Sequence, residues 1–232
     1  MEEKRNFDLL TLGQVLLRLS PPNNDRLVRG DTFVKQVGGA ELNVAVGVAL
    51  LGLRTGVISK LPSHDMGSFM KGKIRSYGVS DDFFMYDDSP SARVGIYYYE
   101  NGAYPRKPKV IYDRSNSSFY SLKIDEIPEK AYTASRCFHT SGITLALCPK
   151  VRETAIEMIK RFKAAGTLVS FDVNFRGNLW TGEEAKECIE QILPYVDIFF
   201  CSEDTARLTF KKTGTAKEMM KSFTEEYPIS IV

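Results

Sequence analysis

The chain has 232 residues, of which 43% are hydrophobic and 26% are charged, and its formal net charge is +2. This length supports one α/β domain with a sizeable core, or one domain with a small appendage. The low net charge provides no field that would attract nucleic acid or a membrane surface. No apolar run approaches the roughly 20 residues of a membrane-spanning helix. We therefore expect a globular protein that binds neither nucleic acid nor membrane.

The first residues and the cysteines favour a cytoplasmic protein. Met1–Arg5 leads directly into an apolar run and lacks the apolar stretch of a secretory signal. The cysteines are scattered, with no histidine at metal-binding spacing: Cys137, Cys148, Cys188 and Cys201. We expect reduced thiols that pack like small hydrophobic side chains.

Short β-like runs alternate with longer amphipathic segments along the chain. The short runs predict strands over residues 7–12, 57–60, 136–140, 168–172, 197–201 and 229–232. Apolar residues at helical spacing predict helices over 42–53 and 151–162. Two capping boxes, which begin at Thr181 and Thr215, predict the starts of two more helices. Repeated β-helix-β units predict an α/β fold with a mostly parallel sheet and helices on both faces.

Two segments, 15–37 and 92–119, interrupt this alternation. In the second, Asn101-Gly102 lies between two runs rich in Tyr and Val, Gly95–Tyr99 and Lys109–Tyr112. Such runs favour strands, and Asn-Gly between strands predicts a hairpin turn. We expect both segments to form a small β-sheet outside the main sheet.

A glycine pair precedes the first predicted helix. Gly38 and Gly39 let the backbone approach a ligand closely, and the helix start offers free N–H groups with a partial positive charge. Asn43 lies in the first turn, where it could bind a polar ligand. The same residues are also compatible with a glycine-rich turn before an ordinary helix. The spacing differs from that of dinucleotide-binding loops, and no Walker A sequence occurs.

The segment Gly38–Ala45, followed by Gly52, resembles the N-terminal signature of the ribokinase (PfkB) family of carbohydrate kinases. Other segments are similar to the 2-keto-3-deoxygluconate kinases of that family: Leu12–Pro22, His139–Thr144 and Asp172–Arg176. The resemblance covers nearly the whole chain. It implies a ribokinase-like fold in which the small sheet is a substrate lid.

The sequence departs from the family pattern at several positions. Gln14 stands where an acidic residue is usual, Pro62 where glycine is usual, and Thr205 where a glutamate associated with hydrated Mg²⁺ is usual. Family members also continue through a Gly-Ala-Gly-Asp motif whose Asp is the catalytic base. We therefore expect residues 1–232 to be an incomplete, C-terminally truncated domain. The catalytic base would lie beyond Val232, and the chain alone would be inactive.

The resemblance implies that ATP, with Mg²⁺, phosphorylates a hydroxyl of a keto-deoxy sugar acid. The residues that we predict to bind this substrate are Gly38, Gly39, Asn43, Tyr97, Tyr112, Arg114 and Arg176. A guanidinium group can bind both oxygens of a carboxylate or phosphate, which is why two arginines belong to this set. We predict that three further residues lie near the phosphates, and we assign no metal ligand: Asn174, Ser202 and Glu203.

Each candidate also has an ordinary structural explanation. The arginines could form surface salt bridges, and the tyrosines could pack on a β surface. His64 and His139 have no visible catalytic partner, so we expect them to be structural, and we expect Trp180 to be packed.

Alternatives for the whole protein are a non-catalytic sugar-acid binding or regulatory protein, a non-functional fragment, and a kinase for fructose or ribose. The resemblance also implies a homodimer formed through the lid.

Overall fold

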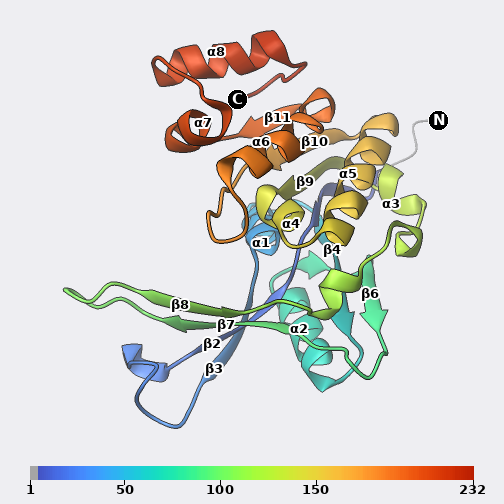
Figure 1. Cartoon of the computed structure of the whole chain (residues 1–232). Coiled ribbons are helices and arrows are strands. Elements are labelled where there is room, and N and C mark those ends of the chain that lie inside the picture. Colours follow the sequence, from blue (N-terminus) through green and yellow to red (C-terminus); the bar gives the residue numbers. More distant parts are fainter. Residues whose placement is uncertain (1–4) are drawn as a thin grey trace.

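The computed structural model describes residues 5–232, and Figure 1 shows its arrangement. Residues 1–4, part of the segment considered above for a secretory signal, lie outside the described residues. The main sheet has the strand order β11-β10-β9-β1-β4-β5, with β6 also paired to β4, and every pair is parallel. Its strands are β1 (Phe7–Leu12), β4 (Thr55–Pro62), β5 (Val79–Ser80), β6 (Phe84–Asp87), β9 (Ser135–Ser141), β10 (Leu168–Asp172) and β11 (Ile198–Phe200).

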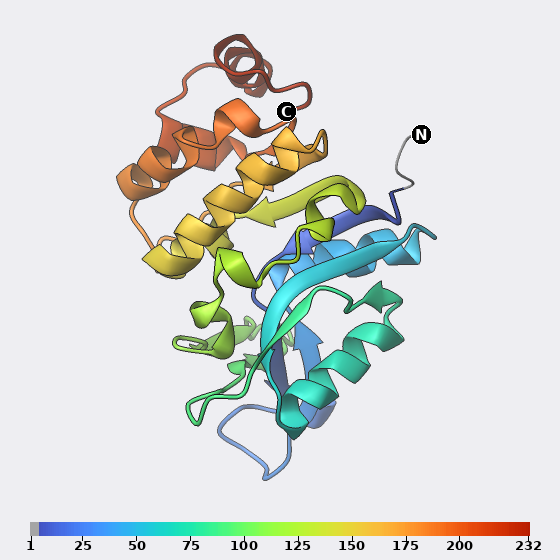
Figure 2. The ribbon, with the colours of Figure 1, turned by 90° about the vertical axis from the view of Figure 1, so that its right-hand side faces the viewer.

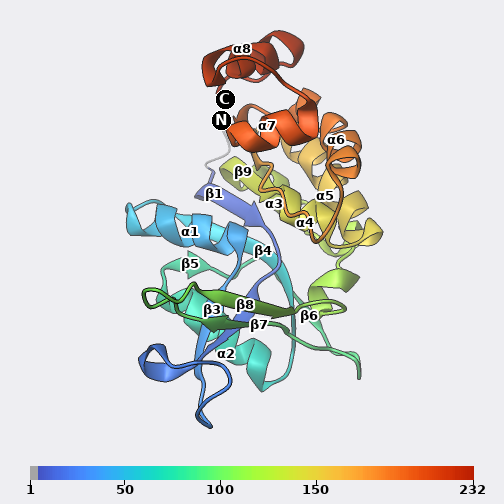
Figure 3. The same ribbon diagram turned by 60° about the vertical axis from the view of Figure 1, so that its left-hand side comes forward.

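Helices cover both faces of this sheet, as predicted. Figure 3 shows α1 on one side of β1, with α3, α4 and α5 on the other side, and Figure 2 shows α5 lying along the sheet. The α-helices are α1 (Ala40–Leu50), α2 (Asp65–Ser76), α3 (Lys130–Thr133), α4 (Gly142–Ala146), α5 (Pro149–Ala164), α6 (Gly182–Glu190), α7 (Glu203–Phe210) and α8 (Ala216–Glu226). Short 3₁₀ helices span Pro22–Asn24, Ser118–Ser121, Ile124–Glu126 and Leu193–Tyr195.

Local sequence signals determine where several helices begin. The hydroxyl of Thr181 accepts a hydrogen bond from the backbone N–H of Glu184, whose side chain accepts from the N–H of Thr181. Thr215 and Glu218 form the same reciprocal pair at the start of α8. Both predicted capping boxes are therefore confirmed. Each one provides hydrogen-bond acceptors for backbone N–H groups that have no partner within the helix.

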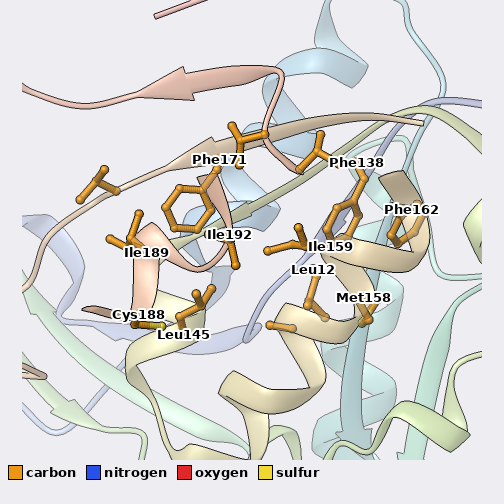
Figure 4. Close-up of a cluster of buried hydrophobic side chains, with 14 of the residues drawn as sticks. Leu12, Phe138, Leu145, Met158, Ile159, Phe162, Phe171, Cys188, Ile189 and Ile192 are labelled. Carbon is orange, nitrogen blue, oxygen red and sulfur yellow. The ribbon is translucent and has the colours of Figure 1, made fainter. Parts of the chain in front are cut away.

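The larger hydrophobic core joins the main sheet to helices α3 to α8, and Figure 4 shows part of it. Leu10 and Leu12 both point into this core, whereas Leu9 and Thr11, which alternate with them on β1, are buried on the opposite face. Phe138 on β9 is fully buried and stacks on Phe162 of α5, with ring centroids 4.0 Å apart. Burial of each such side chain contributes about 1.5–3 kcal/mol, so this layer holds the sheet and α5 together.

A second, smaller core lies on the opposite face of the sheet. It joins α1, α2 and the base of the second sheet through residues that include Leu42, Met70 and Leu17. Val57 belongs to this core, whereas the next residue, Ile58, belongs to the larger one. Adjacent strand residues point to opposite faces, so a fully buried strand such as β4 connects both cores.

The two interrupting segments form a separate sheet that projects from the body of the molecule, as predicted (Figure 1). Its strand order is β3-β2-β7-β8; β2 and β7 are parallel, and the other pairs are antiparallel. The strands are β2 (Leu16–Ser20), β3 (Val34–Gly38), β7 (Gly95–Glu100) and β8 (Lys109–Asp113). We call these four strands the lid.

Two predictions about short segments are wrong in detail. The β7–β8 hairpin forms, but Ala103 bridges Arg106, so the chain reverses at Tyr104-Pro105 rather than at Asn101-Gly102. The segment 229–232 forms only one bridge, between Ile231 and Ile198. The N–H groups of Ser230 and Ile231 both donate to the carbonyl of Asp197, so this segment turns instead of extending along β11.

The remaining structural expectations concern cysteines, Trp180 and membrane spans. All four cysteines are free, and Trp180 is buried. Within residues 5–232, no helix combines the length and the apolar character needed to cross a bilayer.

Candidate substrate site

A cavity of about 530 Å³ lies between the start of α1, the lid and the segment after β10. Gly39, Ala40 and Asn43 line it from α1, and Arg176 and Asn178 line it from the segment after β10. Its size is in the range of small-molecule sites. The carboxyl ends of parallel strands are the usual place for ligands in open α/β sheets, and β10 ends here. The cavity is therefore the candidate substrate site.

Three arginines line this cavity, and none forms a salt bridge with a carboxylate within the described range 5–232. Arg18 comes from β2, Arg114 directly follows β8, and Arg176 lies in the segment after β10. Arginine remains charged in proteins, so these three groups give the cavity a positive potential. Burial lowers the pKa of Arg114, and the nearby charge of Arg176 acts in the same direction.

Gln14 holds Arg114 in place from beneath the cavity. Its Oε1 accepts a hydrogen bond of 2.8 Å from Nε of Arg114, and its Nε2 donates one of 3.0 Å to the carbonyl of Arg114. Nε2 also donates to the hydroxyl of Ser117 at 2.7 Å. Gln14 is buried, and a Cβ on Gly95 would lie 2.8 Å from Nε2, so a side chain there would displace the amide.

A buried carboxyl joins the starts of two helices that border the cavity. Oε1 of Glu41, in α1, accepts hydrogen bonds from the hydroxyls of Ser141 at 2.5 Å and Thr144 at 2.8 Å. Ser141 is the N-cap of α4, whose Ile143 lines the cavity. Burial raises the pKa of the Glu41 carboxyl, although both hydroxyl bonds oppose this. Glu41 therefore fixes α1 relative to α4.

The lid presents one face of its strands to the cavity. Tyr97 and Tyr99 of β7 line the cavity, while Tyr98 between them belongs to the opposite face, where its ring contacts Phe33 at 5.9 Å between centroids. Tyr112 of β8 pairs with Tyr97 in the sheet, and their ring centroids are 6.0 Å apart. Two strands thus place aromatic rings with hydroxyl groups over the same space.

Most of the predicted substrate-binding residues line the cavity: Gly39, Asn43, Tyr97, Tyr112, Arg114 and Arg176. Gly38 does not line it, but a Cβ there would lie 2.6 Å from the hydroxyl of Tyr97. Gly38 therefore leaves room for a tyrosine that does line the cavity.

The residues predicted near the phosphates do not line this cavity. The backbone N–H of Asn174 donates to Asp172, and its φ of 37° turns the chain after β10. Ser202 caps α7, and Glu203 pairs with Arg207 one turn further along that helix. Their role near the phosphates remains a prediction.

Both histidines have structural partners. Nδ1 of His139 lies 2.9 Å from the hydroxyl of Ser170, and burial lowers the pKa of His139 to about 4. Nδ1 of His64 accepts a hydrogen bond from the N–H of Met66 at the start of α2. Neither histidine lines the cavity.

Sequence reasoning missed several residues of the site. Arg18 and Tyr99 line the cavity, and Gln14 and Glu41 hold its walls. Alternation along β7 could have indicated Tyr99, because it faces the same way as Tyr97. No local signal indicated Gln14, because its partner is 100 residues away in the sequence.

The described residues do not assemble a metal site of their own. Within 5–232, no group of three or more His, Cys, Asp or Glu side chains could hold an ion. Magnesium in phosphoryl-transfer enzymes is typically bound through substrate phosphates, water and one or two carboxylates. We assign no step to a metal held by this chain.

Comparison with known proteins identifies the family. Residues 6–228 match the model of the pfkB family carbohydrate kinases. This chain belongs to the pfkB family. The cavity beside the lid is thus the candidate substrate site of a pfkB family member.

Individual proteins that this chain resembles are also named as sugar kinases. The chain is 33% identical over 225 residues to a 2-dehydro-3-deoxygalactonokinase of Haloferax volcanii, a match that covers 97% of this chain and 70% of that protein. The crystal structure of a 2-dehydro-3-deoxygluconokinase from Thermotoga maritima superposes with a TM-score of 0.89 at 32% identity, covering 96% of this chain and 70% of that one. A sugar kinase from Pyrococcus horikoshii in complex with ATP has a TM-score of 0.76 at 25% identity, covering 88% and 66%.

Proposed function

We propose that this chain binds a 2-keto-3-deoxy sugar acid, such as 2-keto-3-deoxygluconate, as the phosphoryl acceptor in an ATP-dependent kinase reaction. The observation that carries the proposal is the cavity with three arginines that have no carboxylate partner among residues 5–232. Unpaired guanidinium groups at a partly buried site favour an anionic ligand. The named activities of the Haloferax and Thermotoga relatives support the same class of substrate.

The rest of the cavity suits the remainder of such a sugar. Asn43 and the backbone N–H groups at the start of α1 can bind hydroxyl groups, and the positive end of the helix favours partial negative charge. Tyr97 and Tyr112 add hydroxyls from the lid. We propose that Arg114 and Arg176 each bind the carboxylate of the sugar acid, the transferred phosphoryl group, or both.

In the proposed reaction, the oxygen of a sugar hydroxyl forms a bond to the γ-phosphorus of ATP. The bond to the bridging oxygen breaks, ADP leaves, and the hydroxyl proton passes to a base. Such transfer depends mainly on positioning and on neutralising charge. The carboxylate that lines the cavity, Asp113, lies 2.8 Å from Arg93, so we do not assign it as the base. The ATP of the Pyrococcus structure supports ATP as donor, and Mg²⁺ remains part of the proposal.

Calorimetry with the 232-residue chain tests the binding step. 2-Keto-3-deoxygluconate should bind, whereas fructose and ribose, which lack the carboxylate, should bind at least about 10-fold more weakly. Preference for a neutral sugar would overturn the assignment of the substrate. Coupled detection of ADP with Mg-ATP then tests turnover.

One second function has a specific observation in its favour. No unpaired carboxylate is among the residues lining the cavity, so sugar binding without phosphoryl transfer would describe a sugar-acid binding or regulatory protein. Because residues 1–232 are expected to be inactive alone, sugar binding is measured by calorimetry with and without Mg-ATP. Sugar-acid affinity that Mg-ATP leaves unchanged would support this second function. ADP release that depends on the sugar would support the kinase.

We also propose that the lid forms a homodimer interface and that the protein acts in the cytoplasm. The face of the lid that points away from the cavity carries exposed apolar residues, including Phe33 and Ile111. Its edge strands β3 and β8 have unpaired backbone groups that another strand could bind. Sedimentation should give a dimer that Ile111→Lys converts to a monomer; a wild-type monomer would contradict the dimer.

A further inference from the structure

We propose that Arg18 is a further substrate-binding residue, which contacts the carboxylate of the sugar acid from the side of the cavity opposite to Arg114. The proposal rests on the proposed function, because it requires that the substrate is a sugar acid. Arg18 and Arg114 would then select sugar acids over neutral sugars together, one from each side of the lid.

Arg18, Tyr97 and Tyr112 form a row across three neighbouring strands of the lid. Arg18 of β2 is paired with Tyr97 of β7, which is paired with Tyr112 of β8, and all three residues line the cavity. The guanidinium of Arg114 lies 5.6 Å from the centroid of the Tyr112 ring, at the other end of the row. Because neighbouring strands are about 4.8 Å apart, β2 and β8 are separated by about 10 Å. The row therefore has an arginine at each end and two tyrosines between them.

The hydroxyl of Tyr97 belongs to the same part of the cavity as Arg18. Burial raises the pKa of Tyr97, and the positive charge of Arg18 opposes this rise. The two oxygens of a carboxylate have about four acceptor sites in total. A carboxylate above Tyr97 can therefore accept hydrogen bonds from this hydroxyl and from a guanidinium group on each side.

Contacts with neutral side chains hold the guanidinium of Arg18 in place. It lies 4.2 Å from the centroid of the Tyr99 ring, its Nε donates to the hydroxyl of Ser20 at 2.9 Å, and its Nη2 donates to Oδ1 of Asn101 at 3.4 Å. Nδ2 of Asn101 donates to Oδ1 of Asn24 at 2.9 Å, which orients the amide with its oxygen toward Arg18. A side chain held in this way loses less conformational entropy when it binds a ligand.

Arg18 provides positive charge in addition to that of Arg114. The negative charge of Glu41, when ionised, acts on Arg114 and partly compensates it. Arg18 forms no salt bridge with a carboxylate of residues 5–232. Its contacts with neutral side chains use Nε and Nη2, and a guanidinium has five N–H donors, so others can donate to a ligand. A carboxylate between two guanidinium groups should therefore bind more tightly than one beside Arg114 alone.

Calorimetry with 2-keto-3-deoxygluconate and with its uncharged methyl ester tests the contact with the carboxylate. The wild-type chain should bind the acid more tightly than the ester. Arg18→Gln should weaken binding of the acid by about 10-fold and change binding of the ester by less than about twofold. Arg18→Lys keeps the charge but loses the planar fork that stacks on Tyr99, so it should weaken binding of the acid by about 3-fold.

Two further variants test the support of Arg18 and control for the loss of an arginine. Asn101 does not line the cavity, so Asn101→Ala should act only through Arg18 and weaken binding of the acid by about 2- to 3-fold. Arg29→Gln makes the same change at an exposed residue in the loop between β2 and β3, and it should leave both affinities unchanged. Thermal unfolding verifies that each variant is folded.

The outcomes distinguish this proposal from the proposed function. If the wild-type chain does not bind the acid, the proposed function fails. If wild type binds the acid, but Arg18→Gln and Arg18→Lys both bind it within twofold of wild type, the role of Arg18 is wrong. Equal losses for the acid and the ester in Arg18→Gln would also overturn it, because they would indicate packing instead of contact with the carboxylate.

Discussion

The main sheet and the lid are built from similar strands, but burial differs between them. In β4 every residue is buried, and both faces contact hydrophobic cores. In β8 every residue is exposed, and one face borders the cavity. The main sheet therefore carries the stability of the protein, while the lid carries side chains that can meet a ligand.

This difference separates two kinds of substitution. A change in the main sheet should lower the free energy of unfolding, because it removes buried contacts. A change on the cavity face of the lid should alter ligand affinity with little effect on stability, because few buried contacts are lost. Each variant below should affect mainly one of these two quantities.

The largest effect on stability is expected from Phe138→Ala. Phe138 is fully buried and stacks on Phe162, so its loss leaves a cavity and should cost about 3–5 kcal/mol. Denaturation with urea measures this cost. Phe200→Ala is the matched control, since that ring is 54% exposed, and it should cost less than about 1 kcal/mol. Equal losses of unfolding free energy in the two variants would contradict the conclusion that packing between β9 and α5 stabilises the fold.

The next effect should appear in binding. Arg114→Leu removes a guanidinium that has no carboxylate partner in the described range, so the affinity for a keto-deoxy sugar acid should fall about 100-fold. It also leaves the buried Oε1 of Gln14 without its donor, so the free energy of unfolding should fall by no more than about 1–3 kcal/mol. Calorimetry and thermal unfolding, measured together, provide the check. Arg136→Leu, whose side chain is 72% exposed, should change neither quantity appreciably. A large loss of stability in Arg114→Leu would mean that Arg114 supports the fold instead of the ligand.

Glu41 lies where the main sheet meets the cavity, and it should make stability depend on pH. Its carboxyl pKa is raised by burial above the ordinary value of 4.5. The stabilising contribution of such a group is fully present below its unfolded pKa and is lost as pH rises through the raised folded value. Glu41→Gln keeps an acceptor for Ser141 and Thr144 but cannot ionise.

Wild type should therefore lose stability relative to Glu41→Gln as the pH rises from about 4 toward neutrality. Urea denaturation of both proteins over this range measures the difference. A difference that stays constant with pH would show that the carboxyl does not change its ionisation in the folded protein.

Sequence predicted the main sheet better than the details of the lid. The run 168–172 agrees with β10 residue for residue, because a short apolar run between polar segments has few alternatives. The capping boxes at Thr181 and Thr215 were also correct, because their hydrogen bonds are local. The Asn101-Gly102 turn was wrong, because Ala103 and Arg106 continue the pairing and move the reversal outward.

The sequence predicted the site residues that belong to motifs, and it missed the residues whose partners are distant in the sequence. Asn43 and Arg114 belong to recognisable motifs, and the cavity brings them together. Gln14 and Glu41 act through partners about 100 residues away, so only the fold reveals their contacts. Arg18 was missed because the alternation of β2 was not assigned to a face before the pairing of β2 with β7 was known.

The smallest effect should come from a single hydroxyl of the lid. Tyr97 lines the cavity, and its hydroxyl lies close to Gly38 at the start of α1. Tyr97→Phe removes one donor and acceptor from the ligand but keeps the ring, so affinity for the sugar acid should fall about 3- to 10-fold. Calorimetry measures this loss.

Tyr98→Phe is the matched control because strand alternation places that ring on the opposite face, against Phe33. It should leave affinity unchanged, and neither variant should alter thermal unfolding appreciably, since both tyrosines lie on a sheet that projects from the core. If both variants lost affinity equally, the two faces of β7 would not be functionally distinct. Ligand binding by the lid would then depend on whole strands instead of on the alternate residues that face the cavity.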